Sequence, residues 1–325
     1  MNEIITVHHN SGRKQYELIE LINKELGDRL VSTENDGGIL TDAVDTFTAD
    51  SFTIKPLFFP GGDIGNLSIS GSVNDTIMLG ARPLYLSLSL VIEEGLKITT
   101  LKNILNSIRK ELETTDTYVL CGDTKVVDKG EVDGLIINTT CLGKAVKEAL
   151  TVDRIKNNDS IIVTGPLGLH GAAVMAYRNG FEIDFESDCS SIMPLLDAVK
   201  KYDIHVMRDL TRGGFVQILN ELAISSRKEI TIDENLLRIP AGVESVSEIL
   251  GINPLYLACE GTAAVFCNRR VENELLTFLK NRGLSPFKAG NVGKDAERPL
   301  VSLRSNSGAE RVLPMLIEEL TPRIC

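Results

Sequence analysis

Segments with the two-residue periodicity of strands alternate along the chain with segments of helical periodicity, and this alternation limits the fold more than any other feature. The clearest strand is predicted over residues 84–92, where leucines at every second position alternate with Tyr85, Ser87 and Ser89. Helices are predicted on either side of it, over 66–79 and 99–112. Such alternation is typical of α/β or α+β proteins, and we expect a fold of this class.

The length of 325 residues allows two domains, each with its own core. The polar stretch 147–158 ends the first of them, so we expect domains at 1–150 and 151–312 and a tail at 313–325. The remaining predicted helices are 13–26, 171–177, 192–202, 215–224, 272–282 and 312–320. The remaining predicted strands are 39–43, 46–54, 117–120, 134–145, 160–165, 229–232, 262–267 and short segments near 287 and 300, and a turn is predicted over 121–125.

The charge balance excludes some partners. The chain has 45 acidic and 34 basic residues and a formal net charge of -11, which argues against a nucleic-acid groove and favours basic or metal-bound partners. The N-terminal residues lack the pattern of a signal peptide, and no apolar run is long enough to span a bilayer. We therefore expect a cytoplasmic protein that binds neither nucleic acid nor membrane.

The chain ends in a cysteine. Five of the six cysteines stand in apolar surroundings and are predicted to be inert core thiols, whereas Cys325 is the final residue. Pro322 disfavours helix at Thr321, so a short extended tail is expected to follow the predicted helix 312–320. Chain ends are usually mobile, and a reactive thiolate there needs a docking pocket. A frayed end with an accidental thiol is the alternative interpretation.

Four aspartates, Asp50, Asp75, Asp123 and Asp209, each stand at the end of an apolar segment or beside a glycine turn. Magnesium is bound by one or two carboxylates together with phosphate oxygens, so carboxylates gathered from several loops suit nucleotide chemistry without a P-loop. Aspartates also favour turns and helix caps for local reasons, and the sequence leaves both interpretations open.

Two further polar residues each have two interpretations, one with a role in the chemistry and one as an ordinary surface residue. Lys125 either meets a phosphate or acts as a base in a dry pocket, or it is a surface lysine. Glu260 stands just before an apolar strand, where it is either a desolvated carboxylate that moves protons or a strand-edge group facing water. The glycine-rich strand-to-helix turn at 165–171 is a weak candidate for an anion site.

Four stretches together resemble the HypE family of nickel–iron hydrogenase maturation proteins, within the superfamily of aminoimidazole ribonucleotide synthetase-like ATP enzymes. They are Ser51-Phe52 with the loop 56–65 (PLFFPGGDIG), 121–127 (CGDTKVV), 208–214 (RDLTRGG) and the terminal Pro-Arg-Ile-Cys325. The resemblance runs nearly from end to end, and the terminal motif is its most specific part. At Gly168-Leu169-His170-Gly171 the chain departs from the family's Gly-Asp-His-Gly.

The resemblance implies an ATP-dependent carbamoyl dehydratase with two α/β domains. A partner carbamoyltransferase would load a carbamoyl group onto Cys325, and this chain would use ATP to dehydrate it to a thiocyanate. The cyano group would then pass to iron on a scaffold complex. The tail would be flexible, with one exposed state and one state inserted beside ATP and the 123–125 turn, and the first domain would bind ATP and form a homodimer through its sheet.

The resemblance also implies roles for individual residues. Catalytic roles fall to Cys325, Lys125 and Glu260. Magnesium and phosphates would be bound by the aspartates Asp36, Asp50, Asp75, Asp123 and Asp209. ATP would also be bound by Gly61, Gly62 and Gly122. Two alternatives compete with this assignment, namely another ATP enzyme of the superfamily, such as a small-molecule kinase or a cyclising synthetase, and a non-catalytic thiol carrier.

Overall fold

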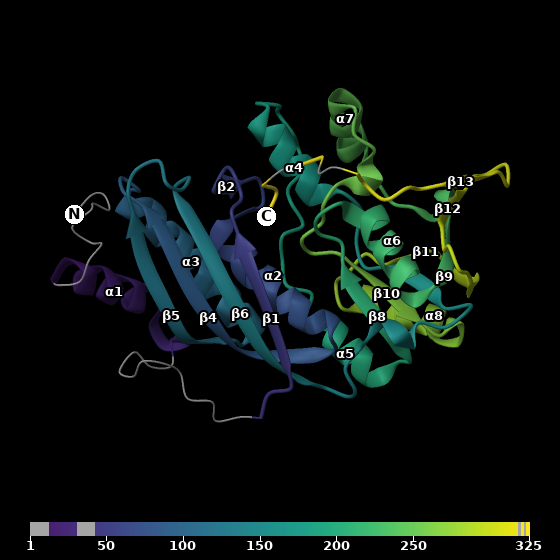
Figure 1. Ribbon diagram of the computed structural model, residues 1–325, viewed down its shortest axis with the longest axis horizontal. Coiled ribbons are helices and arrows are strands. Elements are labelled where there is room, and N and C mark those ends of the chain that lie inside the picture. Colours follow the sequence, from purple (N-terminus) through teal and green to yellow (C-terminus); the bar gives the residue numbers. More distant parts are fainter. Residues whose placement is uncertain (1–12, 31–42, 318–319, 322) are drawn as a thin grey trace.

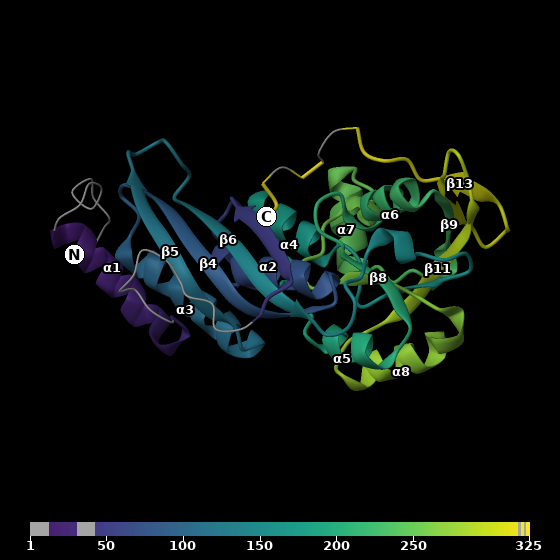
Figure 2. The same ribbon diagram turned by 60° about the horizontal axis from the view of Figure 1, so that its bottom comes forward.

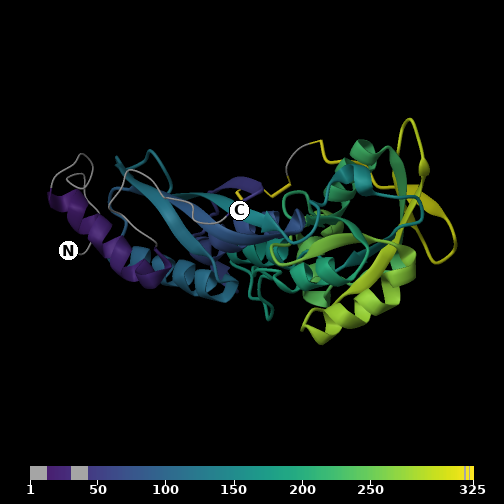
Figure 3. The ribbon, with the colours of Figure 1, turned by 90° about the horizontal axis from the view of Figure 1, so that it is seen from below.

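The computed structural model describes residues 13–30, 43–317, 320–321 and 323–325, which form two lobes that lie side by side (Figure 1). Each lobe is built on one main sheet with helices packed against it, as the alternation of strands and helices predicts. The C-terminus lies between the lobes in all three ribbon views, and Figure 1 shows it close to β2 (Figures 1, 2 and 3). The tail therefore ends inside the molecule's outline.

The first lobe contains a four-stranded sheet in the order β1-β6-β4-β5, in which only the β4–β5 pair is parallel. A hairpin of two short strands, β2 and β3, leads into α2. The elements of this lobe are α1 (Arg13–Leu26), β1 (Thr46–Phe52), β2 (Phe58–Phe59), β3 (Gly62–Asp63), α2 (Ile64–Met78), β4 (Ala81–Glu93), α3 (Ile98–Thr115), β5 (Tyr118–Val127) and β6 (Leu135–Ala145), with a 3-10 turn at Gly27–Arg29.

Among the described residues, helices cover one face of this sheet. Helix α2 packs on β1, β4 and β6, α3 packs on α2, and α1 packs on α3. The residues of β6 alternate between buried and half-buried, as expected when every second side chain points away from the helices. We call the other side the uncovered face; it carries Phe47, Ala49, Ser51, Ser87, Ser89, Val91, Cys121, Asp123, Lys125, Ile136, Asn138, Thr140 and Leu142.

The second lobe contains a seven-stranded sheet in the order β13-β12-β9-β11-β7-β10-β8. The strands are β7 (Ser160–Val163), β8 (Ile204–Asp209), β9 (Lys228–Asp233), β10 (Ala263–Cys267), β11 (Phe287–Asp295), β12 (Val301–Arg304) and β13 (Glu310–Val312). The helices are α4 (Leu169–Arg178), α5 (Pro194–Lys201), α6 (Gly214–Ser226), α7 (Ala241–Leu250) and α8 (Glu272–Asn281), with short 3-10 turns at Val152–Arg154, Glu234–Leu236, Pro254–Tyr256 and Arg269–Val271.

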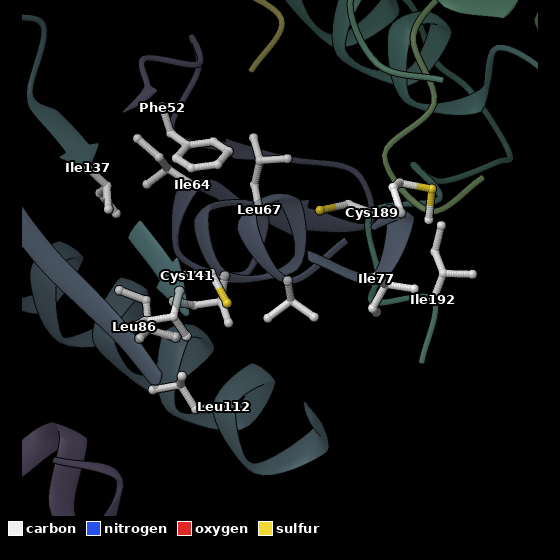
Figure 4. Close-up of a cluster of buried hydrophobic side chains, with 14 of the residues drawn as sticks. Phe52, Ile64, Leu67, Ile77, Leu86, Leu112, Ile137, Cys141, Cys189 and Ile192 are labelled. Atoms are coloured by element: carbon white, nitrogen blue, oxygen red, sulfur yellow. The ribbon is translucent and has the colours of Figure 1, made fainter. Parts of the chain in front are cut away.

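Helix α2 is the element that both lobes share. It is buried on nearly all sides, and it contacts β8 of the second lobe as well as the first sheet. Figure 4 shows Phe52, Leu86 and Ile137 on one side of α2 and Cys189 and Ile192 on the other. All of these belong to one apolar cluster, which also includes Ile324 of the tail. The apolar core is thus continuous from one lobe to the other.

Several predicted elements differ from the structure. The turn predicted at 121–125 is wrong, because β5 continues through it and pairs with β4 as far as Val127. The helix predicted over 312–320 is also wrong: Val312 ends β13, and the described residues after it form no helix. Strand β8 and helix α7 have no predicted counterpart. Four of the five cysteines predicted to be core thiols are buried, but Cys121 is half-buried on the uncovered face.

Some predictions lie outside the described residues, namely Asp36 and the strand 39–43 except for its last residue. Among the helices in the described part of the chain, none combines the length and the apolar character that crossing a membrane requires.

Candidate active site

A cavity of about 530 Å³ lies where β1 and α2 of the first lobe meet β8 of the second. Its size is within the range of small-molecule sites. Four carboxylates, two arginines and the terminal cysteine line it together with apolar and small residues. The charged residues and the cysteine are Asp50, Asp75, Arg208, Asp209, Arg212, Glu260 and Cys325.

Each carboxylate comes from a different element. Asp50 is on β1, opposite Thr139 of β6. Asp75 is near the end of α2, Asp209 is the last residue of β8, and Glu260 precedes β10. Because β8 pairs with β10, the end of β8 lies beside the start of β10, and α2 brings its own carboxylate to the same place. Residues far apart in the sequence thereby share one cavity.

The three aspartates resist ionisation in this arrangement. Burial raises the pKa of Asp75 to about 8, and the charges of Asp209 and Asp50 add to the effect. Burial likewise raises the pKa of Asp50 and of Asp209, against the opposing influence of Arg212 and Arg208 respectively. Burial and mutual repulsion together disfavour the ionised forms of these carboxylates, and a positive charge would offset both effects.

Glu260 is the most deeply placed of the four. Its side chain is 3% exposed, and its Oε1 atom has no hydrogen-bond partner among the described residues. Burial is the main cause that raises its pKa well above the ordinary value, and the charges of Asp209 and Asp188 come next. The structure therefore excludes the interpretation of Glu260 as a strand-edge group facing water and makes it a candidate for proton transfer.

Two polar side chains hold the backbone at Glu260. Asp188 accepts hydrogen bonds from the backbone N–H of Glu260 at 3.0 Å and of Gly261 at 3.1 Å. Asn74, on α2, donates from Nδ2 to the carbonyls of Glu260 and Ser190, both at 3.0 Å. The Asn74 Oδ1 atom accepts from the backbone N–H of Ile192 at 2.8 Å. Sequence reasoning missed both residues, because their role depends on contacts that no local pattern signals.

The cavity also contains positive charge. Arg208 and Arg212 flank Asp209 in sequence and line the cavity. The Arg208 guanidinium lies 3.5 Å from Glu221, and its Nε atom is buried with no hydrogen-bond partner among the described residues. A phosphate oxygen would satisfy such a donor. The motif RDLTRGG was recognised in the sequence, but its arginines were not given a role.

The tail enters this site from the side of β1. Cys325 lines the cavity, and its backbone oxygen accepts a hydrogen bond from the Thr53 N–H at 3.1 Å. Ile324 is 1% exposed, and its carbonyl accepts from His170 Nε2 at 2.8 Å. The terminal cysteine is thus seated in the cavity rather than exposed at a frayed end.

Three predicted site residues on β5 lie outside the cavity. Asp123 and Lys125 are on the uncovered face of β5, and neither lines the cavity. In the sheet order, β5 is three strands from β1, a separation of roughly 14 Å at about 4.8 Å per strand. Gly122 has a local reason to be glycine, because an added Cβ would lie 2.2 Å from the Leu88 carbonyl oxygen.

The glycine turns pack against protein groups. An added Cβ at Gly61 would lie 2.8 Å from the backbone N and O of Ser187, and at Gly62 it would lie 2.7 Å from Asn66 Oδ1. Neither glycine lines the cavity. At the turn before α4, the Gly168 N–H donates to Cys259 Sγ at 3.1 Å and the Gly171 N–H donates to the Ala258 carbonyl at 2.9 Å. These N–H groups are therefore not available to an anion.

The carboxylates fit a magnesium ion only when phosphate oxygens complete the site. Within the described ranges, no group of three His, Cys, Asp or Glu side chains is arranged to hold a metal by itself. The raised pKa values nevertheless mark Asp50, Asp75 and Asp209 as carboxylates that a cation would stabilise in the ionised form. Magnesium commonly binds through one or two carboxylates and substrate phosphates.

Stability is expected to fall as the pH rises in the absence of divalent cations. Asp75 has a pKa of about 8 in the folded chain and the ordinary value of 3.8 when unfolded, so folding takes up a proton between these values. Its contribution is complete below the unfolded value and is lost as the pH rises through about 8. We expect a lower melting temperature at pH 9 than at pH 6 in EDTA, measured by calorimetry, and a shallower slope for Asp75→Asn.

The control for this experiment is Asp197→Asn, since Asp197 is a half-exposed carboxylate on α5 outside the cavity. It should keep the wild-type slope. A slope for Asp75→Asn that equals that of the wild type would contradict the assignment of the proton to Asp75.

Comparisons with known proteins agree with this architecture. The family model described as AIR synthase related protein, N-terminal domain, matches residues 34–145, and that of the C-terminal domain matches 156–301. The chain is 33% identical to carbamoyl dehydratase HypE of Escherichia coli strain K12, over 100% of both chains. The predicted two-domain fold is confirmed.

Solved structures give the same result. A hydrogenase maturation protein HypE in complex with ATP matches with a TM-score of 0.93 and 34% identity, over 99% of this chain and 100% of that one. A HypE-HypF complex matches with a TM-score of 0.80 and 33% identity, over 92% of this chain and 99% of that one.

Proposed function

The chain belongs to the HypE family of carbamoyl dehydratases, and we propose that it uses ATP to convert an S-carbamoyl group on its own Cys325 into a thiocyanate. One observation carries the proposal: the terminal cysteine lines the same cavity as four carboxylates and two arginines. This cavity provides groups for a metal, for phosphates and for proton transfer within reach of one thiol. The product would supply the cyanide ligand of a nickel–iron hydrogenase.

The reaction balances as an ATP-driven dehydration. The carbamoyl oxygen forms a bond to the γ-phosphorus while the bond from that phosphorus to ADP breaks. The carbon–oxygen bond then breaks, so that inorganic phosphate carries away the former carbamoyl oxygen, and the nitrogen gives up both of its protons, one to a carboxylate base and one to the departing phosphate. Phosphorylation is needed because an amide oxygen is a poor leaving group and a phosphate is a good one.

We assign roles to the cavity residues on the basis of their charge and burial. Arg208 and Arg212 would bind phosphate oxygens, and Asp50, Asp75 and Asp209 would hold magnesium, which would offset the charge of the phosphates. Burial is the main cause of the raised pKa of Glu260 and the neighbouring carboxylates add to it, so a cation beside those carboxylates would favour the ionised form of Glu260. Glu260 then accepts a proton from the carboxamide nitrogen. ATP as the nucleotide is supported by the complex of the similar protein with ATP.

Two partners follow from this reaction. A carbamoyltransferase must place the carbamoyl group on Cys325, and the HypE-HypF complex of a similar protein supports a partner for that step. An iron-scaffold complex must accept the cyano group afterwards. Both partners need the thiol of Cys325, so the tail has to leave the cavity between steps.

A homodimer through the uncovered face would account for Lys125. This face exposes apolar side chains, with Phe47 68% exposed, on a sheet whose other side packs against α2. Asp123 and Lys125 lie on the same face, away from the cavity of their own chain. We infer that Lys125 acts at the cavity of the partner subunit, where it binds phosphate or orients the carboxamide. The division into domains at about residue 150 belongs to the same proposal.

Mixed dimers test this arrangement. Cys325→Ala and Lys125→Ala chains should each be inactive alone, because one lacks the substrate thiol and the other lacks the lysine. If Lys125 acts across the dimer, random mixing restores about a quarter of the wild-type sites, since half of the dimers are mixed and each has one complete site. The measurement is thiocyanate on Cys325 by mass spectrometry after co-refolding or co-expression.

The control experiment mixes chains that carry Cys325→Ala with chains that carry Glu260→Gln. Both residues belong to the cavity of one chain, so a mixed dimer has no complete site and should stay inactive. An inactive mixture of the Cys325→Ala and Lys125→Ala chains, with dimers present, would place Lys125 in its own chain's reaction or outside the mechanism.

The proposed function is tested by following the intact mass of the chain with a carbamoyltransferase, carbamoyl phosphate and ATP-magnesium. The C-terminal peptide should gain one carbamoyl group and then lose one water only when ATP is hydrolysed. Loading without loss of water would support a thiol carrier. No modification of the tail would overturn the proposal and favour a small-molecule ATP enzyme of the superfamily.

A further inference from the structure

The last three residues of the chain are each contacted by different groups at one place, which we call the tail seat. It consists of Thr53, Lys55, Asp133, His170 and Arg178. The backbone of 323–325 runs antiparallel to 53–55, because the Thr53 N–H donates to the Cys325 oxygen at 3.1 Å and the Lys55 N–H donates to the Arg323 oxygen at 3.4 Å. The tail is thus added beside the end of β1 like an extra strand.

The side chain of Arg323 is held at both ends of its guanidinium. Its Nη1 lies 2.8 Å from Asp133 Oδ2, and its Nε donates to the Thr53 carbonyl at 2.9 Å. The Arg178 guanidinium donates to the Arg323 carbonyl. Arg323 has a φ of 53°, so the chain turns through the left-handed region to make these contacts together.

The next residue is held by an apolar and a polar contact. The Ile324 side chain is 1% exposed and belongs to the apolar cluster around α2. Its carbonyl accepts from His170 Nε2, whose other nitrogen lies 2.8 Å from Ser187 Oγ. Ser187 Oγ accepts from the Cys189 N–H at 3.0 Å, so its hydroxyl is free to donate to His170 Nδ1. The neutral His170 with its proton on Nε2 satisfies the whole chain of hydrogen bonds.

All of these contacts are noncovalent. In binding terms, the covalent connection to the rest of the chain gives the tail a high effective concentration at the seat. We propose that the tail seat is a sequence-specific peptide site that accepts a separate peptide ending in Arg-Ile-Cys, so that the chain dehydrates an S-carbamoyl cysteine supplied in trans. This inference rests on the proposed function for its chemistry, and the reaction balances as it does for Cys325.

The contacts also rank the residues of such a peptide. The isoleucine is fully buried, so replacing it with alanine should weaken binding about 10- to 100-fold. The hydrogen bond from His170 should be worth roughly 2- to 10-fold. The Asp133 ion pair is nearly half exposed, so it should be worth about 2- to 5-fold. Binding to the tail seat should therefore depend most on the isoleucine and least on the arginine.

The test uses the full chain with Ile324→Asp and Cys325→Ala, whose own tail neither reacts nor buries an apolar side chain in the tail seat. The probe is the acetylated peptide Leu-Thr-Pro-Arg-Ile-Cys with a carbamoylated thiol and a free C-terminal carboxylate, given with ATP-magnesium. We expect conversion of the peptide to its thiocyanate. Peptides with Ala for Ile should react about 10- to 100-fold less well at low concentration.

A charge exchange makes the assignment specific. Asp133→Lys in the same background should prefer the peptide with Glu in place of Arg, reversing the original preference. The matched control is Glu131→Gln, because Glu131 is exposed in the same loop and contacts the backbone N–H of Asp128 instead of the tail. It should keep the original preference. Equal turnover of all the peptides by all variants would overturn the tail seat as a sequence-specific site.

The outcomes also separate this inference from the proposed function. If the wild-type chain dehydrates its own tail but the variant converts no peptide at millimolar concentration, the inference fails and the function stands. If the wild-type chain does not dehydrate its own tail, the function fails, and fluorescence polarisation with a labelled peptide ending in Arg-Ile-Ser decides the inference. Saturable binding that is lost on Ile→Ala supports the tail seat, and no binding overturns it.

Discussion

Replacing Cys325 with alanine is expected to abolish every carbamoyl and cyano adduct on the chain while ATP binding stays within about twofold of the wild type. The loss is complete because the thiol is the atom to which the substrate is attached, and no neighbouring group replaces it. ATP binding persists because the charged groups of the cavity come from β1, α2, β8, the turn after β8 and the loop before β10, which do not depend on the tail. Mass spectrometry of the C-terminal peptide and calorimetric titration with ATP measure the two effects.

The control is Cys121→Ala, because Cys121 is the other half-buried cysteine and lies on the uncovered face. This variant should be loaded and dehydrated like the wild type. Adducts that persist in Cys325→Ala, or that disappear in Cys121→Ala, would move the reactive thiol away from the tail. Loss of ATP binding in Cys325→Ala would show that the tail helps to form the nucleotide site.

Replacing Glu260 with glutamine should leave loading of Cys325 unchanged and slow the dehydration by about 10²- to 10⁴-fold, the usual contribution of a proton-transfer group. Glutamine has nearly the same shape, and the backbone of residue 260 keeps its hydrogen bonds with Asp188 and Asn74. Only the ability to ionise is lost. Single-turnover experiments on carbamoylated chain, started with ATP-magnesium, measure the rate.

A matched control is Glu111→Gln. Glu111 is on α3, burial raises its pKa as well, and it lies outside the cavity, where it accepts from the Ser191 N–H. This change should leave the rate of dehydration unaffected. If Glu260→Gln reacts at the wild-type rate, the proton acceptor is another group, and Lys125 of the partner subunit becomes the candidate.

Periodicity predicted most of the architecture. Helix α1 begins and ends at the predicted residues, and β4 extends the predicted strand by a few residues at its N-terminal end and one at its C-terminal end. Both segments have an uninterrupted pattern of apolar residues. The missed strand β8 contains His205, Arg208 and Asp209, which break the apolar pattern of a buried strand. The hydrogen bonds that make β8 a strand come from β10, and the local sequence of β8 does not indicate this pairing.

Local turn chemistry misled the prediction at two places. Gly122 and Asp123 favour a turn, yet β4 lies alongside them in parallel register and extends the strand through both. The apolar residues between 312 and 320 resemble a helical stripe, but Leu313 is buried against the second lobe in an extended segment. In both cases tertiary contacts outweighed local propensity.

The charged groups of the site were partly predictable. Asp50, Asp75, Asp209 and Glu260 stood out as acids beside apolar segments, and the structure brings them together with Cys325. Their burial, and hence their raised pKa values, depends on how the two lobes meet, which no local pattern contains. The same limit explains why Asp123 and Lys125, from an equally suggestive motif, lie on the other face of the sheet.

The way the lobes share α2 determines how the tail can be released. Opening the molecule like a hinge would break all three hydrogen bonds of Asn74 and expose the continuous core around α2. Peeling residues 323–325 away from the end of β1 breaks the contacts of the tail seat and uncovers one isoleucine. The second route costs far less free energy than opening the lobes. Cys325 can therefore leave and re-enter the cavity while the catalytic groups stay assembled. Each cycle then needs no rebuilding of the site.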